Sequence, residues 1–175
     1  MLKQQSLSLF FNLPKNKVIP KDYINNETYI MYFDGASKGN PGPGGSGVVI
    51  FDSRGNEINH TILLLCPNFK VTNNVAEYNG LIAGLEDAKD LKIGKLVVKG
   101  DSLLIIKQMS NEYKVKNENM KELYKRAKEV EKYFEEVKYI HIPREENKIA
   151  DRLSNEAIKI NKEKHSNNTL LDCCK

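Results

Sequence analysis

The chain has 175 residues, 40% of them hydrophobic and 29% charged, with a formal net charge of +4. This balance is typical of one globular domain with its own core. No apolar run approaches the roughly 20 residues that span a bilayer, which excludes a transmembrane helix. The three cysteines, Cys66, Cys173 and Cys174, lack metal-ligand spacing, which favours a reducing compartment over a disulfide framework.

In chain order, the sequence predicts a meander of three strands followed by alternating helices and strands. The helix after the meander is indicated by Val75, Tyr78, Leu81 and Leu85, which recur at helical spacing. The expected strands cover 29–34, 47–52, 57–65, 95–101 and 137–142, and the expected helices 72–91, 102–109, 118–136 and 145–160. This order predicts an α/β fold with a five-stranded mixed sheet flanked by helices.

The segment "YFDGASKGNPGPGGSG", residues 32–47, is rich in glycine and proline. A loop that cradles a phosphate leads from a strand into a helix, whose N-terminus supplies the amide donors. Here the segment leads into "GVVIFD", a strand, and it lacks the Gly-Lys-Ser/Thr ending of a P-loop. The segment therefore predicts a compact hairpin turn.

Four acids stand at the ends of predicted elements. Asp34 ends the first strand and Asp101 the fourth, and Glu77 and Asp151 are expected in the first turns of the first and last long helices. If the first and fourth strands are adjacent and parallel, all four gather at one sheet edge. Such a cluster is costly unless cations occupy it. Oxygen ligands suit Mg²⁺ or Mn²⁺, and two ions about 4 Å apart promote in-line attack on a phosphodiester.

Each acid also has a purely structural interpretation. Asp34 suits a turn before glycine, and Asp101 suits the N-cap of the helix that follows it. Asn74 and Glu77 have the spacing of a capping box, and Asn147 with Asp151 nearly has it. The convergence of four acids is what favours a metal site over these interpretations.

Four segments, "FDGASKGNPGPGG", "TNNVAEYNGLIAGL", "GDSLLIIKQM" and "ENKIADRLSNEA", resemble the signature segments of type 1 ribonuclease H, in the family's order. The resemblance implies a ribonuclease H-like fold and an endonuclease that cuts the RNA strand of RNA–DNA hybrids, leaving 5′-phosphate ends. It assigns catalysis and metal binding to Asp34, Glu77, Asp101 and Asp151. We expect a flexible N-terminal segment over 1–27, the catalytic domain over 28–161 and a polar tail over 162–175.

The resemblance also assigns contacts with the minor groove of the hybrid. Small residues permit close backbone approach, and amide side chains both donate and accept towards 2′-hydroxyls and base edges. In this sequence the matching residues are Gly35, Ser37, Gly39, Asn40, Asn73 and Asn74, with Thr72 at a phosphate of the DNA strand.

The chain departs from many relatives in three places. It lacks their histidine loop before the fourth carboxylate: His141 falls in the expected strand, where we interpret it as structural or exposed. Arg144, Glu145 or Glu146 are the candidates for the duties of that histidine. The chain also lacks a basic, tryptophan-rich insert, and Leu103 stands where many relatives carry a polar groove contact.

Near the N-terminus, Gln4, Leu7, Phe10 and Phe11 have the spacing Gln-x-x-aliphatic-x-x-aromatic-aromatic. This resembles the motif with which replication proteins dock onto the sliding clamp of eukaryotes and archaea. The last three share one face of a helical turn and would form an apolar plug. The alternatives are an arbitrary hydrophobic tail or a mitochondrial import signal.

The leading hypothesis is a monomeric, intracellular ribonuclease H of the cytoplasm or of the nucleus and its replication compartment, with the mitochondrion left open. One rival is a catalytically weak module that only binds hybrids, although a binder has no reason to keep a costly anionic cluster. The other is a related nuclease that acts on other nucleic-acid structures. The groove-contact residues favour the hybrid as substrate.

Overall fold

The computed structural model describes residues 27–65 and 71–167. The clamp-like motif and all three cysteines lie outside these ranges. The strands are β1 (Thr28–Ser37), β2 (Gly44–Phe51), β3 (Glu57–Leu64), β4 (Lys95–Gly100) and β5 (Glu136–His141). The helices are α1 (Asn73–Asp90), α2 (Leu103–Met109), α3 (Glu118–Glu131) and α4 (Lys148–Asn167), with a 3-10 turn at Arg144–Glu146.

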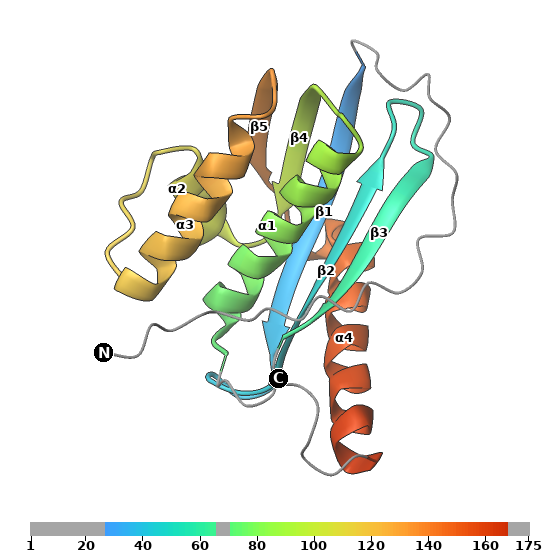
Figure 1. The fold of residues 1–175 in the computed structure, drawn as a ribbon, viewed down its shortest axis with the longest axis vertical. Helices are drawn as coiled ribbons and strands as arrows, with labels where there is room; N and C mark the ends of the chain where they lie inside the picture. Colours follow the sequence, from blue (N-terminus) through green and yellow to red (C-terminus); the bar gives the residue numbers. More distant parts are fainter. Residues whose placement is uncertain (1–26, 66–70, 168–175) are drawn as a thin grey trace.

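The five strands form one mixed sheet of order β3-β2-β1-β4-β5. β1, β2 and β3 pair antiparallel, whereas β4 runs parallel to both β1 and β5. Helices α1 to α3 lie over one face and α4 over the other (Figure 1). The predicted α/β fold, with a five-stranded mixed sheet flanked by helices, is confirmed.

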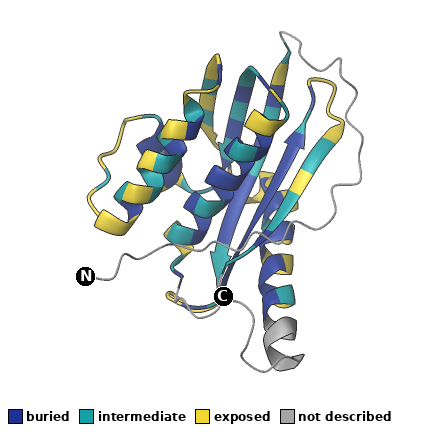
Figure 2. Cartoon of the chain, viewed as in Figure 1, coloured by how far each residue is buried: buried dark blue, intermediate teal, exposed yellow. Residues whose placement is uncertain are grey.

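The core lies between the sheet and α1. Alternate residues of β1, Tyr29, Met31 and Phe33, are at most 1% exposed and belong to the same cluster as Leu81 and Leu85 of α1. β2 is buried on both of its faces, because α1 covers one and α4 the other (Figure 2). This explains why β2 reads as a continuous run of small and apolar residues. Among the described residues, no helix combines the length and apolarity needed to cross a membrane.

The glycine-rich segment is a hairpin, but the expected extent of its turn was wrong. β1 continues to Ser37 and β2 begins at Gly44, so only residues 38–43 form the loop. The loop is closed by a hydrogen bond from Lys38 N to Pro43 O at 2.8 Å. Two further bonds of 2.9 Å join the backbones of Gly42 and Val71, and they hold the loop beside the start of α1.

Two strand glycines let helices approach the sheet closely. A Cβ at Gly35 would lie 2.1 Å from the backbone nitrogen of Glu77, and one at Gly47 would lie 2.5 Å from the carbonyl oxygen of Ala150. α1 and α4 therefore occupy the space that side chains would take on β1 and β2. Gly35 and Gly47 therefore do not form the turn. They lack a side chain, and this makes room for the two helices.

The third long helix ends earlier than expected. α3 stops at Glu131, whereas the charge pattern suggested a helix to residue 136. The backbone nitrogens of Glu135 and Glu136 both bond to Gly94 O, at 2.8 and 3.2 Å, and draw the chain beside β4. Tertiary pairing with β4 thus replaces the last turn of the helix.

Candidate active site

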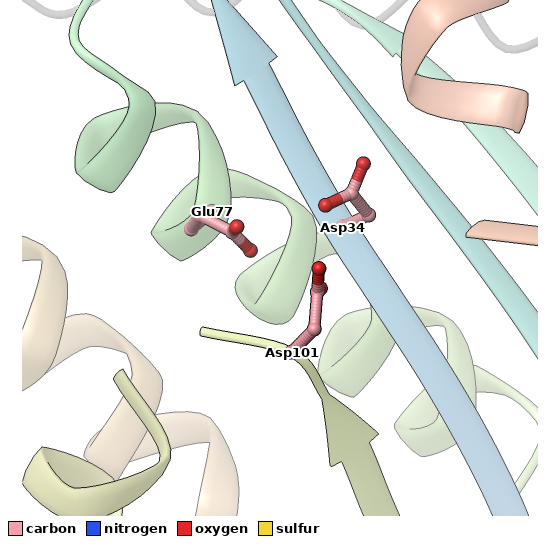
Figure 3. Close-up of side chains that lie close together, drawn as sticks. All are labelled: Asp34, Glu77 and Asp101. Carbon is pink, nitrogen blue, oxygen red and sulfur yellow. The ribbon is translucent and has the colours of Figure 1, made fainter. Parts of the chain in front are cut away.

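Three acids meet where the pairing between β1 and β4 stops. Asp101 directly follows β4, whereas Asp34 lies inside β1, so the prediction that Asp34 ends its strand was wrong. Because Tyr32 pairs with Lys99 in parallel register, Asp34 and Asp101 emerge side by side at the same sheet edge. Glu77 reaches them from α1, and one oxygen from each of the three carboxylates lies within 4.8 Å of the others. The three side chains point toward one another from β1, from the residue that follows β4 and from α1 (Figure 3).

Glu77 is placed by how α1 begins. Thr72 is the N-cap, and its Oγ1 accepts a hydrogen bond from Val75 N at 3.4 Å. Glu77 therefore lies in the second turn of α1, and its placement in the first turn was wrong. The alternative interpretation, a capping box of Asn74 and Glu77, is wrong because Thr72 is the N-cap.

The Glu77 carboxylate is buried, and one of its two oxygens has no hydrogen-bond partner among the described residues. The side chain accepts a hydrogen bond from the backbone N–H of Gly35, which the close approach of α1 to β1 makes possible. Its second oxygen, Oε2, is buried and has no hydrogen-bond partner among the described residues. Buried carboxylate oxygens normally accept a hydrogen bond. This oxygen is therefore free to bind a group from outside the protein, such as a metal ion.

Burial and like charges raise the pKa of two of the acids. For Glu77, burial raises the pKa well above its usual value, and the charges of Asp34 and Asp101 add to the effect. For Asp34, burial again raises the pKa most, whereas a hydrogen bond from Ser154 opposes the rise. The chain alone thus disfavours full ionisation of the cluster. An all-oxygen donor set with an unpartnered oxygen fits a hard divalent cation such as Mg²⁺ or Mn²⁺.

The fourth predicted acid, Asp151, lies near the cluster but is paired. It stands in the first turn of α4, as expected, and its charge contributes to the raised pKa of Asp34. Arg144 Nη2 donates to Asp151 Oδ1 at 2.6 Å. The Arg144 side chain is 74% exposed, and its charge also acts on Asp34 and Glu77. Arg144 is one of the candidates for the duties of the absent histidine. Its positive charge lies beside Asp151 and acts on the acidic cluster.

Two buried residues that the sequence analysis did not assign to the site, Asn147 and Ser154, hold the carboxylates of Asp101 and Asp34. Asn147, just before α4, donates from Nδ2 to Asp101 Oδ1 at 2.8 Å and to the Phe33 carbonyl at 2.9 Å. Ser154, one turn after Asp151, donates from Oγ to Asp34 Oδ2. Asp101 is not the N-cap of α2, a role that Ser102 takes. The signal available in the sequence was the helical spacing of Asn147 and Ser154 about Asp151.

The predicted groove-contact residues gather where the hairpin loop meets α1. Asn73 Oδ1 accepts from Ser37 N at 2.8 Å and lies 2.7 Å from Ser37 Oγ, and Asn40 Oδ1 accepts from Asn73 N at 3.2 Å. Ser37 Oγ also lies 2.6 Å from the Gly39 carbonyl. Asn74 is exposed beside them. Gly35 differs, because it is buried under α1.

The remaining candidates lie on three elements near the acids in sequence: the end of β5, the 3-10 turn before α4 and the start of α2. His141 is exposed at the end of β5, as interpreted, with Nε2 3.3 Å from the Asp101 carbonyl oxygen. Glu145 and Glu146 are exposed in the 3-10 turn that precedes Asn147. Leu103, at the start of α2, is 45% exposed.

Comparisons with known proteins agree with this geometry. A family model described as "Reverse transcriptase-like" matches residues 32–157. The chain is 41% identical over 132 residues to bifunctional protein Rv2228c of Mycobacterium tuberculosis and 38% identical over 130 residues to ribonuclease HI of Halobacterium salinarum. These matches cover 74% and 73% of this chain, and 35% and 62% of the two relatives.

Among solved structures, LC11-RNase H1 in complex with an RNA/DNA hybrid superposes with a TM-score of 0.70 at 40% identity. The match covers 75% of this chain and 97% of that one. The region matched by the family model, residues 32–157, contains all four acids, Asp34, Glu77, Asp101 and Asp151. On this evidence, the chain belongs to the ribonuclease H family.

Proposed function

We propose that the protein is a metal-dependent endoribonuclease that hydrolyses the RNA strand of RNA–DNA hybrids and leaves 5′-phosphate ends. The observation that carries the proposal is the cluster of Asp34, Glu77 and Asp101, in which a buried oxygen of Glu77 lacks a partner. A protein that only bound hybrids would gain nothing from such a cluster, because like charges in a buried site oppose folding. The cluster therefore favours catalysis over simple binding.

Within the site, we assign metal binding to Asp34, Glu77 and Asp101, with Asp151 as the fourth ligand once it leaves Arg144. Two Mg²⁺ ions, or Mn²⁺ in their place, would supply stabilisation of the charge that develops at the phosphodiester. Arg144 then becomes free to interact with a phosphate oxygen of the substrate. Burial of the Glu77 side chain keeps water from competing for its oxygens.

The hybrid is the favoured substrate because of the network at the start of α1. Ser37, Asn40 and Asn73 are joined by hydrogen bonds and stand at the surface beside the acidic edge. Short hydroxyl and amide groups of this kind suit the 2′-hydroxyls of an RNA strand in a wide minor groove. The hybrid-bound structure of the related LC11 enzyme supports the same choice.

We further propose that the chain acts as a monomer and that residues 4–11 bind a sliding clamp, which would place the enzyme at replication sites. The support for the clamp is the sequence motif alone.

The central test is a cleavage assay with labelled RNA–DNA hybrid, RNA duplex and DNA duplex, each with Mg²⁺ and with EDTA. We expect cleavage of the RNA strand of the hybrid in Mg²⁺ only. Equal cleavage of the DNA duplex would favour a related nuclease with a different substrate. Hybrid binding without any cleavage in Mg²⁺ or Mn²⁺ would favour the binding module.

A further inference from the structure

The Asp34 carboxylate has a dedicated hydrogen-bond donor on the protein side of the site. Ser154 of α4 is fully buried, at 0% exposed, and its Oγ donates to Asp34 Oδ2. Among the described residues, no other side chain donates a hydrogen bond to this carboxylate. A carboxylate otherwise turns freely about its last side-chain bond, so this contact decides how its oxygens face Glu77 and Asp101.

The serine hydroxyl has two acceptors but one proton. Its Oγ also lies 2.9 Å from the carbonyl oxygen of Asp151, the usual local bond of a serine within a helix. A carboxylate is the stronger acceptor of the two because the bond is assisted by charge. The proton therefore goes to Asp34 whenever that carboxylate is ionised. The Asp151 carbonyl still accepts a hydrogen bond from Asn155 Nδ2 at 2.7 Å.

The contact depends on the missing side chain of Gly47. Asp34 and Gly47 are direct partners across β1 and β2. A Cβ at Gly47 would lie 2.6 Å from the backbone nitrogen of Ser154, so α4 lies directly on the strand next to Asp34. From that position the shortest hydroxyl side chain is long enough to bridge to the carboxylate.

We infer that Ser154 is a positioning residue for metal binding: its hydroxyl fixes the Asp34 carboxylate so that the remaining lone pairs face Glu77 and Asp101. The inference rests on the proposed metal-dependent function. Ligands must be held within about 0.5 Å of their productive geometry, and residues that hold ligands typically contribute 10- to 100-fold to affinity or activity.

The test compares Ser154→Ala with Thr61→Val. Ser154→Ala removes one oxygen, keeps Cβ and improves helix propensity, so the variant folds. Thr61→Val is the matched control: it removes a hydroxyl that donates to another buried carboxylate, Asp87 Oδ2 at 2.5 Å, away from the acidic cluster. The measurements are calorimetric titration of the metal-free proteins with Mn²⁺, the rise in melting temperature on adding Mn²⁺, and kcat and KM on the hybrid.

We expect Ser154→Ala to weaken Mn²⁺ binding about tenfold, to lose most of the Mn²⁺-induced rise in melting temperature, and to lower kcat with little change in KM. Thr61→Val should differ from the wild type by less than about twofold in Mn²⁺ affinity. Mn²⁺ affinity of Ser154→Ala within about twofold of the wild type would overturn the inference, as would equal weakening in both variants. The proposed function fails separately, if the wild type binds Mn²⁺ but does not cleave the hybrid.

Discussion

Arg144 and Asp151 form an ion pair whose charges both act on Asp34 of the acidic cluster, with a nitrogen–oxygen distance of 2.6 Å. Arg144 lies in the 3-10 turn just before α4 and Asp151 in the first turn of α4, so the fourth carboxylate and its cation are close in the chain. The pair is exposed on the arginine side, where solvent weakens it. It can therefore separate at little cost when another cation or a phosphate competes for either partner.

Removing Arg144 should strengthen metal binding. In Arg144→Ala the site loses a positive charge that repels incoming cations, and Asp151 becomes free, so we expect Mn²⁺ affinity to rise about threefold at low salt and less at high salt. Arg152→Ala, which removes a neighbouring exposed arginine, is the control for net charge. Calorimetric titration measures both variants. Unchanged or weaker affinity in Arg144→Ala would show that Arg144 does not compete with the metal.

Neutralising Asp34 or Asp101 should remove cleavage and keep the fold. Because the pKa of Asp34 is raised in the folded state, the stability it contributes is present at low pH and is lost as the pH rises through that pKa. Asp34→Asn is neutral at every pH. In EDTA at pH 7 we expect it to melt about 3 °C above the wild type, equivalent to roughly 1 kcal/mol, and the difference should vanish near pH 3.

Asp52→Asn provides a control of opposite sign. Hydrogen bonds from Asn56 lower the pKa of Asp52, so its stabilising contribution is present at neutral pH and lost on acidification. This variant should melt below the wild type at pH 7 and cleave hybrid normally. Hybrid cleavage within tenfold of the wild type by a folded Asp34→Asn protein would contradict the assignment of the metal site.

Asn73 should govern substrate affinity more than turnover. In Asn73→Ala, Ser37 loses the acceptor of its backbone N–H, and the junction between the loop and α1 loses its order. We expect KM for the hybrid to rise about tenfold with kcat changed less than threefold, because the acids are untouched. Asn119→Ala on the exposed face of α3 is the matched control. A fall in kcat at constant KM would instead connect Asn73 with the chemical step.

His141 should contribute little to turnover. It is held in β5, with its ring beside the Asp101 carbonyl rather than a carboxylate. His141→Ala is expected to retain kcat within about threefold of the wild type. A loss of about 100-fold, the scale of general acid–base catalysis, would mean that the ring moves into the site during turnover.

The clamp motif can be tested without the catalytic domain. A peptide of residues 1–17 should bind a eukaryotic or archaeal sliding clamp in a calorimetric titration. Phe10→Ala combined with Phe11→Ala should lower that affinity by two or more decades, because each aromatic anchor is expected to be worth about 2 kcal/mol. Cleavage of free hybrid by the full chain with both substitutions should be unchanged.

A peptide with residues 4–11 in scrambled order is the control for general hydrophobic binding. Absence of heat with the native peptide at high micromolar concentration would reject the motif. Cleavage of the segment inside mitochondria would identify it as an import signal.

The sheet edge could be predicted because its causes are local. Asp34 and Asp101 each come after a short apolar run, Asp34 inside β1 and Asp101 directly after β4, and the meander before α1 left β1 free to pair in parallel with β4. The sequence predicted Glu77 in the first turn of α1, whereas it lies in the second, because the residue at which α1 begins was harder to predict. Asn74 and Thr72 both suit an N-cap, and the contacts of the loop with the start of α1 decide between them.

The interactions around the acids escaped sequence reasoning because they join residues far apart in the chain. Ser154 lies 120 positions from Asp34, and Asn147 lies 46 positions from Asp101. Serine and asparagine near a helix start are usually caps or solvated groups, so their types alone carry little information. Only the docking of α4 against glycines of β2 brings them to the carboxylates.

That docking has a consequence for anyone who tries to stabilise this protein. Gly45 and Gly47 are poor strand formers, and exchanging them for valine or threonine is a standard way to improve a central strand. Here each added side chain would push α4 outward, since a Cβ at Gly45 would lie 2.4 Å from that of Ala157. The displaced helix would carry Asp151, Asn147 and Ser154 with it. The weakest strand residues by propensity are thus the ones that a stability screen must leave alone.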